Sequence, residues 1–253
     1  MTFNESNRVA WITGAGKGIG RALARRLANE GWIVAASART EKDLASLKAE
    51  CPPGSAYCFP LDVTDATATF SVVARIVSEI GPLNLVVLNA GNYLPMTAET
   101  FSTETVRDLI ETNLMGVVHG LEQVIPMFLA RRDGHIAVVA SLAGYRGLPT
   151  SSAYGASKAA LINMCEALKP ELDFAGVKLT LINPGFVETP LTDKNKFFMP
   201  FLIPVEYAVD AIVAGLETSA FEISFPRRLS FLMKFLRLLP ARLFFALTRR
   251  MVL

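Results

Sequence analysis

Short, continuously apolar segments alternate with longer amphipathic segments along the first three-quarters of the chain. The short segments do not alternate apolar with polar residues, which is typical of strands buried on both faces of a parallel sheet. The longer segments place apolar residues three or four positions apart, as Leu23 and Leu27 are, which is typical of helices. Strands that alternate with helices over short connections predict a doubly wound α/β fold.

The pattern gives bounds for the expected elements. Strands are predicted at 8–12, 32–38, 56–61, 85–88, 135–140, 177–182 and 222–225. Helices are predicted at 18–30, 41–50, 66–80, 103–129, 153–174 and 204–217. Right-handed crossovers then gather the carboxyl ends of the strands along one edge, where ligands bind in such folds. We therefore predict one Rossmann-like domain with about seven strands over residues 1–225 and a separate tail over 226–253.

Composition excludes several classes of protein. A chain of 253 residues, 51% of them hydrophobic, is long enough to bury a large core. A net charge of +2 argues against a nucleic-acid partner. The three cysteines, Cys51, Cys58 and Cys165, form no disulfide or zinc pattern, which predicts free thiols and no metal. The polar start of the chain and the absence of a long uncharged apolar run predict no signal peptide and no membrane-spanning helix, hence a cytoplasmic protein.

A glycine-rich turn lies between the first predicted strand and the first predicted helix. Glycine permits a tight turn and a close approach of the backbone to a diphosphate, and the start of the following helix favours the same anion. The spacing is not G-x-G-x-x-G, because Ile19 occupies the last glycine position, but the place in the chain is that of a dinucleotide site. The predicted cofactor contacts in this turn are Thr13, Gly14, Gly16, Lys17, Gly18, Ile19 and Gly20.

The end of the second predicted strand distinguishes NADP from NAD. An acid there bonds the ribose 2′-hydroxyl of NAD, whereas an arginine accommodates the 2′-phosphate of NADP. Ser37 and Ala38 provide no acid, and Arg39 follows directly. Lys17 adds a second cation, although by itself it is equally compatible with a solvated surface position. The two cations predict NADP. Asp62, after the third strand, either meets the adenine edge or caps the next turn.

Four polar residues form a candidate catalytic set. Tyr154 and Lys158 are four apart on one predicted helix and therefore share a face. A neighbouring ammonium favours the phenolate and lowers the pKa of tyrosine, which otherwise lies near about 10. Ser141 ends the fifth strand and can donate to a developing oxyanion, and Asn113 can hold a water that relays protons past Lys158. The set is suited to moving a proton while hydride moves to or from a carbonyl carbon.

Taken in order, these motifs resemble the short-chain dehydrogenase/reductase family in its NADP-preferring type. The resemblance extends over residues 8 to 225 and rests on the turn at 13–20, Asn89-Ala90-Gly91, Asn113, Ser141, Tyr154, Lys158 and Asn183-Pro184-Gly185. One departure is Leu88, where many members carry a second asparagine before Asn89, and it should alter only a local hydrogen bond.

The resemblance implies roles for individual residues. It makes Tyr154 the general acid/base, Ser141 the group that orients the carbonyl, Lys158 the group that lowers the pKa of Tyr154, and Asn113 the end of a proton relay. It implies further cofactor contacts by Asp62, Val63, Asn89, Ala90, Gly91, Tyr154, Lys158, Pro184, Gly185, Val187 and Thr189. It also implies a homodimer or homotetramer. His119 and His135 fit no metal or catalytic pattern and are expected to be structural.

The implied activity is NADP(H)-dependent hydride transfer between nicotinamide and a carbonyl or secondary alcohol. The segment 195–204 corresponds to a variable substrate lid, and its apolar residues Phe197, Phe198, Met199, Phe201 and Leu202 favour an apolar or lipid-like substrate unless they pack on the core. A 3-oxoacyl thioester reductase is one alternative. An inactive cofactor-binding scaffold is another, and the intact catalytic set argues against it.

The tail at 226–253 departs most from the family pattern. It carries seven lysines and arginines and no acid, which leaves the rest of the chain at −5. Ser230, Lys234, Arg237 and Ala241 form a narrow polar stripe on a mostly apolar segment, and Pro240 divides that segment in two. The pattern predicts an amphipathic helix pair on an anionic membrane surface. A helical arm on a second subunit and a disordered tail remain alternatives.

Overall fold

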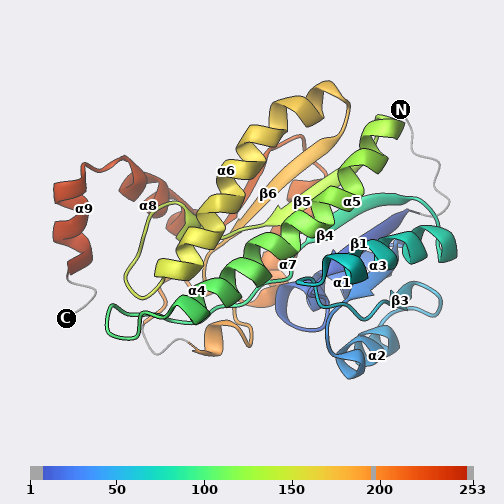
Figure 1. Cartoon of the computed structure of the whole chain (residues 1–253), viewed down its shortest axis with the longest axis horizontal. Helices are drawn as coiled ribbons and strands as arrows, with labels where there is room; N and C mark the ends of the chain where they lie inside the picture. The colour runs from blue at the N-terminus through green and yellow to red at the C-terminus, as the bar shows by residue number, and fades with distance from the viewer. Residues whose placement is uncertain (1–7, 195–197, 250–253) are drawn as a thin grey trace.

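A computed structural model of the chain describes residues 8–194 and 198–249. Its centre is a parallel sheet of seven strands, in the order β3-β2-β1-β4-β5-β6-β7 (Figure 1). The strands are β1 Val9–Thr13, β2 Ile33–Ser37, β3 Ala56–Cys58, β4 Leu83–Leu88, β5 His135–Val139, β6 Lys178–Pro184 and β7 Glu222–Phe225. The order reverses between β1 and β4, and a ligand crevice forms beyond the strand carboxyl ends at such a point. The predicted doubly wound, Rossmann-like α/β fold is confirmed.

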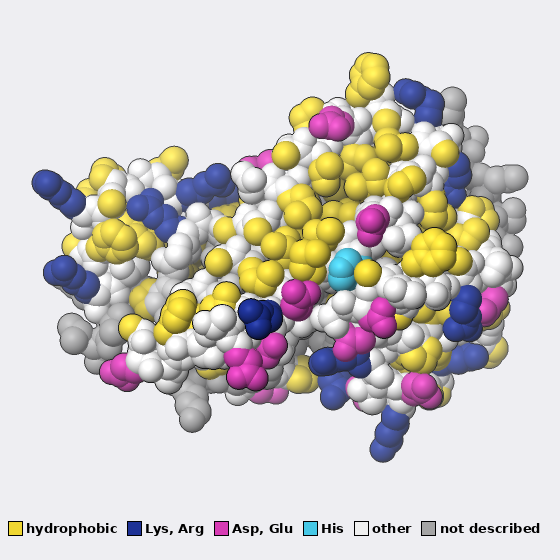
Figure 2. All heavy atoms as spheres, viewed as in Figure 1, with side chains coloured by type: hydrophobic (Ala, Val, Ile, Leu, Met, Phe, Trp, Pro, Cys, Tyr) yellow, Lys and Arg dark blue, Asp and Glu magenta, His cyan; other side chains and the backbone are white. Residues whose placement is uncertain are grey.

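Helices cover both faces of the sheet, as Figure 1 shows. They are α1 Gly18–Asn29, α2 Glu41–Glu50, α3 Ala66–Glu79, α4 Thr103–Ile110, α5 Gly116–Arg131, α6 Ser152–Phe174, α7 Val205–Leu216, α8 Arg227–Leu238 and α9 Ala241–Thr248. One apolar core lies between the sheet and α1, α2 and α7, and a second lies between the sheet and α3, α5, α6 and α8. Apolar side chains also gather on the outer face over α5 and α6 (Figure 2).

Two elements differ from the expected pattern. The long helix predicted at 103–129 is interrupted by a π-helical turn, Glu111–Met115, which separates α4 from α5. Such turns often mark functional sites, and this one contains Asn113. Strand β3 ends at Cys58 instead of continuing to residue 61, although the backbone N–H groups of Phe59 and Leu61 still donate to the carbonyl oxygens of Ala36 and Ala38.

The described part of the tail is a helix pair, as predicted, and it lies at one end of the molecule (Figure 1). Leu229 and Met233 of α8 belong to the core beneath α6. The division into a domain at 1–225 and a tail at 226–253 therefore stays a prediction. Within the described residues, no helix combines the length and apolar character needed to cross a membrane. Phe197 and Arg250 lie outside the described residues.

Candidate active site

The glycine turn forms a cradle that only glycine fits. Gly14 and Gly18 have φ angles of +67° and +55°, a conformation that side-chain-bearing residues rarely adopt. A Cβ on Gly20 would lie 2.4 Å from Asn89 Nδ2 and 2.5 Å from the Gly14 carbonyl oxygen. The turn ends at Lys17, which precedes α1 and contributes no capping side chain, so the first backbone N–H groups of α1 remain directed at the turn. The cradle is suited to an anionic diphosphate.

Asn89 and Thr13 connect this cradle to the neighbouring strand. The Thr13 hydroxyl oxygen accepts hydrogen bonds from the backbone N–H groups of Asn89 (3.0 Å) and Ala90 (3.1 Å). In return, Asn89 Nδ2 donates to the Thr13 carbonyl at 2.9 Å. These bonds join β1 to β4 at the point where the strand order reverses. The structure thus brings the predicted residues Thr13, Gly14, Asn89 and Ala90 together.

The region that would read the adenosine ribose has no acid on β2. Ser37 is buried, and its hydroxyl accepts a hydrogen bond from Trp11 Nε1 at 3.0 Å, so it is part of the core. Arg39 is exposed just beyond the strand. Lys17 is exposed as well, and its ammonium lies 3.5 Å from a carboxylate oxygen of Asp43, an acid on α2 that the sequence did not single out. Both predicted cations are accessible at this edge.

Asp62 performs the second of the two roles considered for it. Its carboxylate accepts hydrogen bonds from the backbone N–H (3.1 Å) and the hydroxyl (2.9 Å) of Thr64, which closes a turn before α3. Val63 is buried against Gly116, and its carbonyl contacts the imidazole of His119 at 2.9 Å. An adenine contact by Asp62 or Val63 stays a prediction.

Tyr154, in the first turn of α6, lies against two other candidate groups. The Tyr154 side chain interacts with that of Ser141. The ring of Tyr93 meets the ring of Tyr154 edge to face, with centroids 5.1 Å apart. Burial raises the pKa of the Tyr154 hydroxyl, while the interaction with Ser141 lowers it and Tyr93 raises it. The net direction is opposite to the lowering expected from Lys158.

Lys158 is buried one helical turn from Tyr154. Its ammonium donates to the Val139 carbonyl at the end of β5 (2.9 Å) and lies 5.9 Å from the centroid of the Tyr154 ring. Burial lowers the pKa of Lys158 to about 8. At this distance the ammonium has not offset the effect of burial on Tyr154. A Cβ on Gly91 would lie 3.4 Å from the Lys158 nitrogen, so the Asn89–Gly91 segment borders the same space.

Asn113 is fully buried in the π-helical turn, and its side chain makes three hydrogen bonds. Its Nδ2 donates to the Asn92 carbonyl (2.9 Å) and to the Ser157 hydroxyl (3.1 Å), and its Oδ1 accepts from the Asn92 N–H (2.7 Å). Ser157 in turn donates to the Tyr154 carbonyl at 2.7 Å. Sequence reasoning missed Asn92, Tyr93 and Ser157. Their positions directly after Asn89-Ala90-Gly91 and between Tyr154 and Lys158 were the available signal.

The segment after β6 lies beside the cradle. The Pro184 carbonyl is 3.3 Å from the Ser141 hydroxyl. A Cβ on Gly18 would lie 3.2 Å from the Thr189 methyl group, which brings Thr189 to the glycine turn. Val187 is buried and pairs with Ile203 across the base of the lid. Beyond it, Phe198 is 88% exposed, whereas Phe201 and Leu202 are 43% and 38% exposed.

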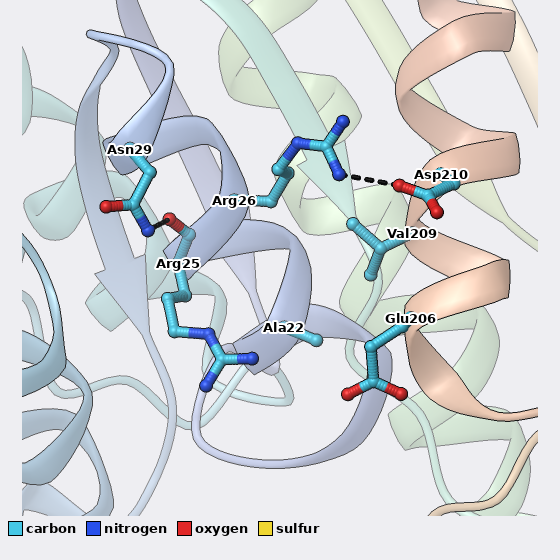
Figure 3. Close-up of a pocket in the computed structure, with 7 residues that line it drawn as sticks. All are labelled: Ala22, Arg25, Arg26, Asn29, Glu206, Val209 and Asp210. Atoms are coloured by element: carbon cyan, nitrogen blue, oxygen red, sulfur yellow. Dashed lines mark hydrogen bonds and ion pairs between the residues drawn. The ribbon is translucent and has the colours of Figure 1, made fainter.

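The two histidines bond to groups within the fold, and their structural role stays a prediction. His135 contacts the Thr180 hydroxyl at 2.9 Å, and burial lowers its pKa to about 3. Among residues 8–194 and 198–249, no His, Cys, Asp or Glu cluster has the composition of a metal site. A shallow pocket between α1 and α7, shown in Figure 3, is bridged by the ion pair between Arg26 and Asp210 and contains none of the predicted site residues.

Known proteins resemble this chain over most of its length. The family model for short chain dehydrogenase matches residues 8–197. An uncharacterized oxidoreductase from Myxococcus xanthus is 40% identical over 97% of this chain and 98% of its own length. A 3-oxoacyl-[acyl-carrier-protein] reductase from Thermotoga maritima is 35% identical over 74% of this chain and 77% of its own length.

Solved structures share the fold. A short-chain dehydrogenase/reductase from Burkholderia phymatum in complex with NAD superposes with a TM-score of 0.83 at 24% identity, covering 92% of this chain and 94% of that one. An alcohol dehydrogenase from Thermococcus sibiricus, complexed with 5-hydroxy-NADP, superposes with a TM-score of 0.76 at 25% identity, covering 87% of this chain and 96% of that one.

Proposed function

The chain belongs to the short-chain dehydrogenase family of oxidoreductases, and on that premise we propose that it is an NADP(H)-dependent enzyme that interconverts a carbonyl group and a secondary alcohol. The observation that carries the proposal is the convergence of Tyr154, Ser141, Lys158 and Asn113 beside a glycine cradle with exposed cations and no acid at the end of β2. The proposed activity is supported by the geometry of the site more than by the fold, because one fold can carry many activities.

The residues present are suited to a dinucleotide phosphate. Because Gly14, Gly18 and Gly20 carry no Cβ, the turn packs closely on Asn89, Ala90 and Thr189. The backbone N–H groups at the start of α1 would then bind the diphosphate. Arg39 and Lys17 would bind the 2′-phosphate. Val187 and Thr189 would contact the nicotinamide carboxamide, with Pro184 and Gly185 beside them. When bound, the nicotinamide supplies or accepts the hydride.

The chain's own groups handle the proton. Tyr154 donates its hydroxyl proton to the carbonyl oxygen during reduction and takes it back during oxidation. Ser141 donates a hydrogen bond to the same oxygen and orients it. Lys158, drawn toward Tyr154, favours the phenolate, and Asn113 holds the π-helical turn against Asn92 and Ser157 so that a proton relay can pass Lys158.

The decisive test of the proposed NADP(H) dependence is a measurement of cofactor preference. NADPH and NADH are titrated into the wild type and into Arg39→Ala, with nicotinamide fluorescence as the readout. We expect tighter binding of NADPH than of NADH by the wild type, and a loss of at least about ten-fold in NADPH affinity in the variant, since one charge-assisted hydrogen bond is removed. Affinity for NADH should be unchanged.

The other outcomes have definite meanings. If NADH binds as tightly as NADPH and Arg39→Ala changes neither, the cofactor assignment is wrong and NAD-linked alcohol oxidation becomes the first activity to assay. If neither cofactor binds, a scaffold role replaces the enzyme. The Burkholderia phymatum and Thermococcus sibiricus neighbours carry NAD and an NADP derivative respectively, so both cofactors are compatible with this fold.

We propose an apolar, lipid-like carbonyl compound as substrate. Exposed Phe198, Phe201 and Leu202 support this, because apolar side chains near a site entrance favour apolar ligands. The second candidate is reduction of 3-oxoacyl thioesters, favoured by the name of the Thermotoga maritima relative. Turnover of a 3-oxoacyl thioester at a higher kcat/KM than a long-chain ketone would select the second candidate.

The location and partners belong to the same proposal. The protein would be cytoplasmic and would form a homodimer or homotetramer. The apolar side chains that gather over α5 and α6 support self-association (Figure 2). Peripheral contact between residues 226–253 and an anionic membrane surface completes the proposal, with a second subunit as the competing occupant of that segment.

A further inference from the structure

The outer side of α8 and α9 exposes large apolar side chains. On α8, Phe231, Phe235 and Leu238 are four and three residues apart, so they share one face, and each is at least 59% exposed. Figure 2 shows hydrophobic and basic side chains side by side at this end of the molecule. We call Phe231, Phe235 and Leu238 the apolar outer face; Leu243, Phe245 and Leu247 of α9 are exposed as well.

The opposite side of the helix pair is fixed to the protein. Leu229 and Met233 are buried in the core, and Phe244 of α9 is only 3% exposed. The polar stripe, predicted to face an anionic membrane surface, is partly turned inward, because β7 provides partners for Ser230 and Lys234. Ser230 bonds the Ser224 hydroxyl at 2.8 Å, and Lys234 forms an ion pair with Glu222 at 2.6 Å.

Arg146 stabilises the connection between α8 and α9. Its Nη1 donates to the carbonyl oxygens of Leu236 (3.1 Å), Arg237 (2.8 Å) and Leu239 (2.8 Å) at the end of α8. The same guanidinium lies over the ring of Phe244 at 4.2 Å. The apolar outer face is therefore held outward by specific bonds on its inner side.

The positive charge of the tail indicates which kind of partner the apolar outer face would bind. The exposed arginines of the helix pair are Arg227, Arg228, Arg237, Arg242 and Arg249. None of them forms an ion pair with any residue that the structure describes. The sequence from residue 226 onward contains no acid to neutralise them. Exposed aromatic and aliphatic side chains among unneutralised arginines are typical of helices that lie in the interface of an anionic bilayer.

We infer that α8 and α9 dock this protein on an anionic lipid bilayer, with the apolar outer face inserted at the level of the headgroups and the arginines bound to lipid phosphates. The inference deepens the proposed function and rests on it for the substrate. A second copy of the chain fits the same face less well, since a symmetric contact would bring two sets of arginines together.

Docking in this orientation brings the catalytic edge to the bilayer. A Cβ on Gly185 would lie 2.7 Å from the Leu229 side chain, so α8 begins beside the segment that contacts Ser141. Arg146 lies five residues after Ser141 on the same loop. A carbonyl compound dissolved in the bilayer would then reach the site without crossing water, which makes membrane-dissolved, long-chain ketones or aldehydes the substrate class.

The test measures vesicle binding by the full-length protein. Vesicles of phosphatidylcholine, with and without phosphatidylglycerol, are sedimented with the wild type, with the double variant Phe235→Asp/Leu238→Asp, and with Phe174→Asp. Phe174 is 87% exposed at the end of α6 and outside the tail, so its variant is a matched control. Thermal unfolding by circular dichroism verifies that all three proteins are folded.

We expect the wild type and Phe174→Asp to bind the anionic vesicles, more weakly as salt rises, and the double variant to bind at least about ten-fold more weakly, because two apolar side chains no longer enter the interface. Absence of binding by the wild type, or equal binding by the double variant, overturns the inference. So does a wild-type oligomer that the double variant dissociates in light scattering without any vesicle binding.

Activity separates this inference from the proposed function. Consumption of NADPH is followed with a small water-soluble ketone and with a long-chain ketone dissolved in the anionic vesicles. The double variant should retain the rate on the soluble ketone and lose at least about ten-fold on the dissolved one. If the wild type reduces neither ketone but binds vesicles, the proposed function fails while the docking surface stands.

Discussion

His135, a half-buried residue, makes the stability of the sheet depend on pH. It begins β5, where burial is the main cause and the charges of Lys178 and Lys169 the lesser causes of a pKa lowered from 6.5 to about 3. Between these pH values the unfolded chain binds a proton at this site and the folded chain does not. Acid therefore favours unfolding, and the stability present above pH 6.5 is lost as the pH falls toward 3.

We expect His135→Gln to remove much of this acid sensitivity, because glutamine can still bond the Thr180 hydroxyl and does not titrate. The free energy of unfolding of the wild type should fall by about 3 kcal/mol more than that of the variant between pH 7 and pH 4. Urea unfolding at each pH measures the difference. Parallel pH profiles for the two proteins would contradict the prediction.

The proposed catalytic residues illustrate what sequence can predict at this scale. Tyr154, Lys158, Ser141 and Asn113 were identifiable because each stands at a recognisable place in the chain. The protonation state of Tyr154 could not be predicted from the sequence. Its pKa depends on the balance between burial and the Lys158 ammonium, whose position only the fold determines. Tyr93 was missed for the same reason: an edge-to-face contact with Tyr154 has no sequence period.

Among the elements, the turn between β1 and α1 is tightly packed at Gly20. Alanine is normally better than glycine inside a helix by about 1 kcal/mol. At Gly20 that preference should be reversed, since the new Cβ would lie 2.4 Å from Asn89 Nδ2 and 2.5 Å from the Gly14 carbonyl oxygen. Relief of these contacts requires β1 and β4 to separate or the cradle to open.

Gly20→Ala should therefore lower the free energy of unfolding by about 1 to 3 kcal/mol and weaken NADPH binding by at least about ten-fold. Gly147→Ala is the matched control, because nothing lies within 4 Å of the Cβ it would add and its φ is not in the left-handed region. Thermal unfolding and fluorescence titration report the two effects. Equal behaviour of both variants would mean that the cradle adapts easily.

The strands and helices were largely predictable because their apolar periods are strong. The π-helical turn between α4 and α5 was not, because it depends on distant partners. Asn113 there bonds Asn92 and Ser157, and Gly116 brings the chain against Val63. The end of β3 was overestimated because the apolar run continues to Leu61, three residues beyond Cys58, the last residue in register with β2.

At the scale of the whole molecule, side-chain bonds join α8 to the sheet in addition to the covalent chain. Glu222 of β7 accepts hydrogen bonds from Lys234 of α8, from Asn183 of β6 and from Tyr145 of the loop after Ser141. Burial by itself would raise the pKa of Glu222, and these bonds lower it overall. The composition of the tail predicted its helices, but the ties at Glu222 and Arg146 depend on which side of α8 faces the sheet.

A chain that ends after Phe225 should therefore be much less stable than the full chain, although its sequence contains the whole catalytic set. It loses Leu229 and Met233 from the core, and the loss of one such side chain typically costs about 2 to 5 kcal/mol. Since total stability is about 5 to 15 kcal/mol, the shortened chain should be poorly soluble or melt far below the full chain.

A chain that ends after Leu239 provides the graded comparison, because it retains α8 with its core contacts and loses only α9. We expect thermal stability to decrease in the order full chain, chain ending at 239, chain ending at 225, as measured by circular dichroism. If the chain ending at 225 has the same melting temperature as the full chain, residues 1–225 form an independent domain and α8 contributes little to its stability. If the chain ending at 239 is as unstable as the shorter one, the stacking of Arg146 on Phe244 carries more of the attachment than the core contacts of α8 do.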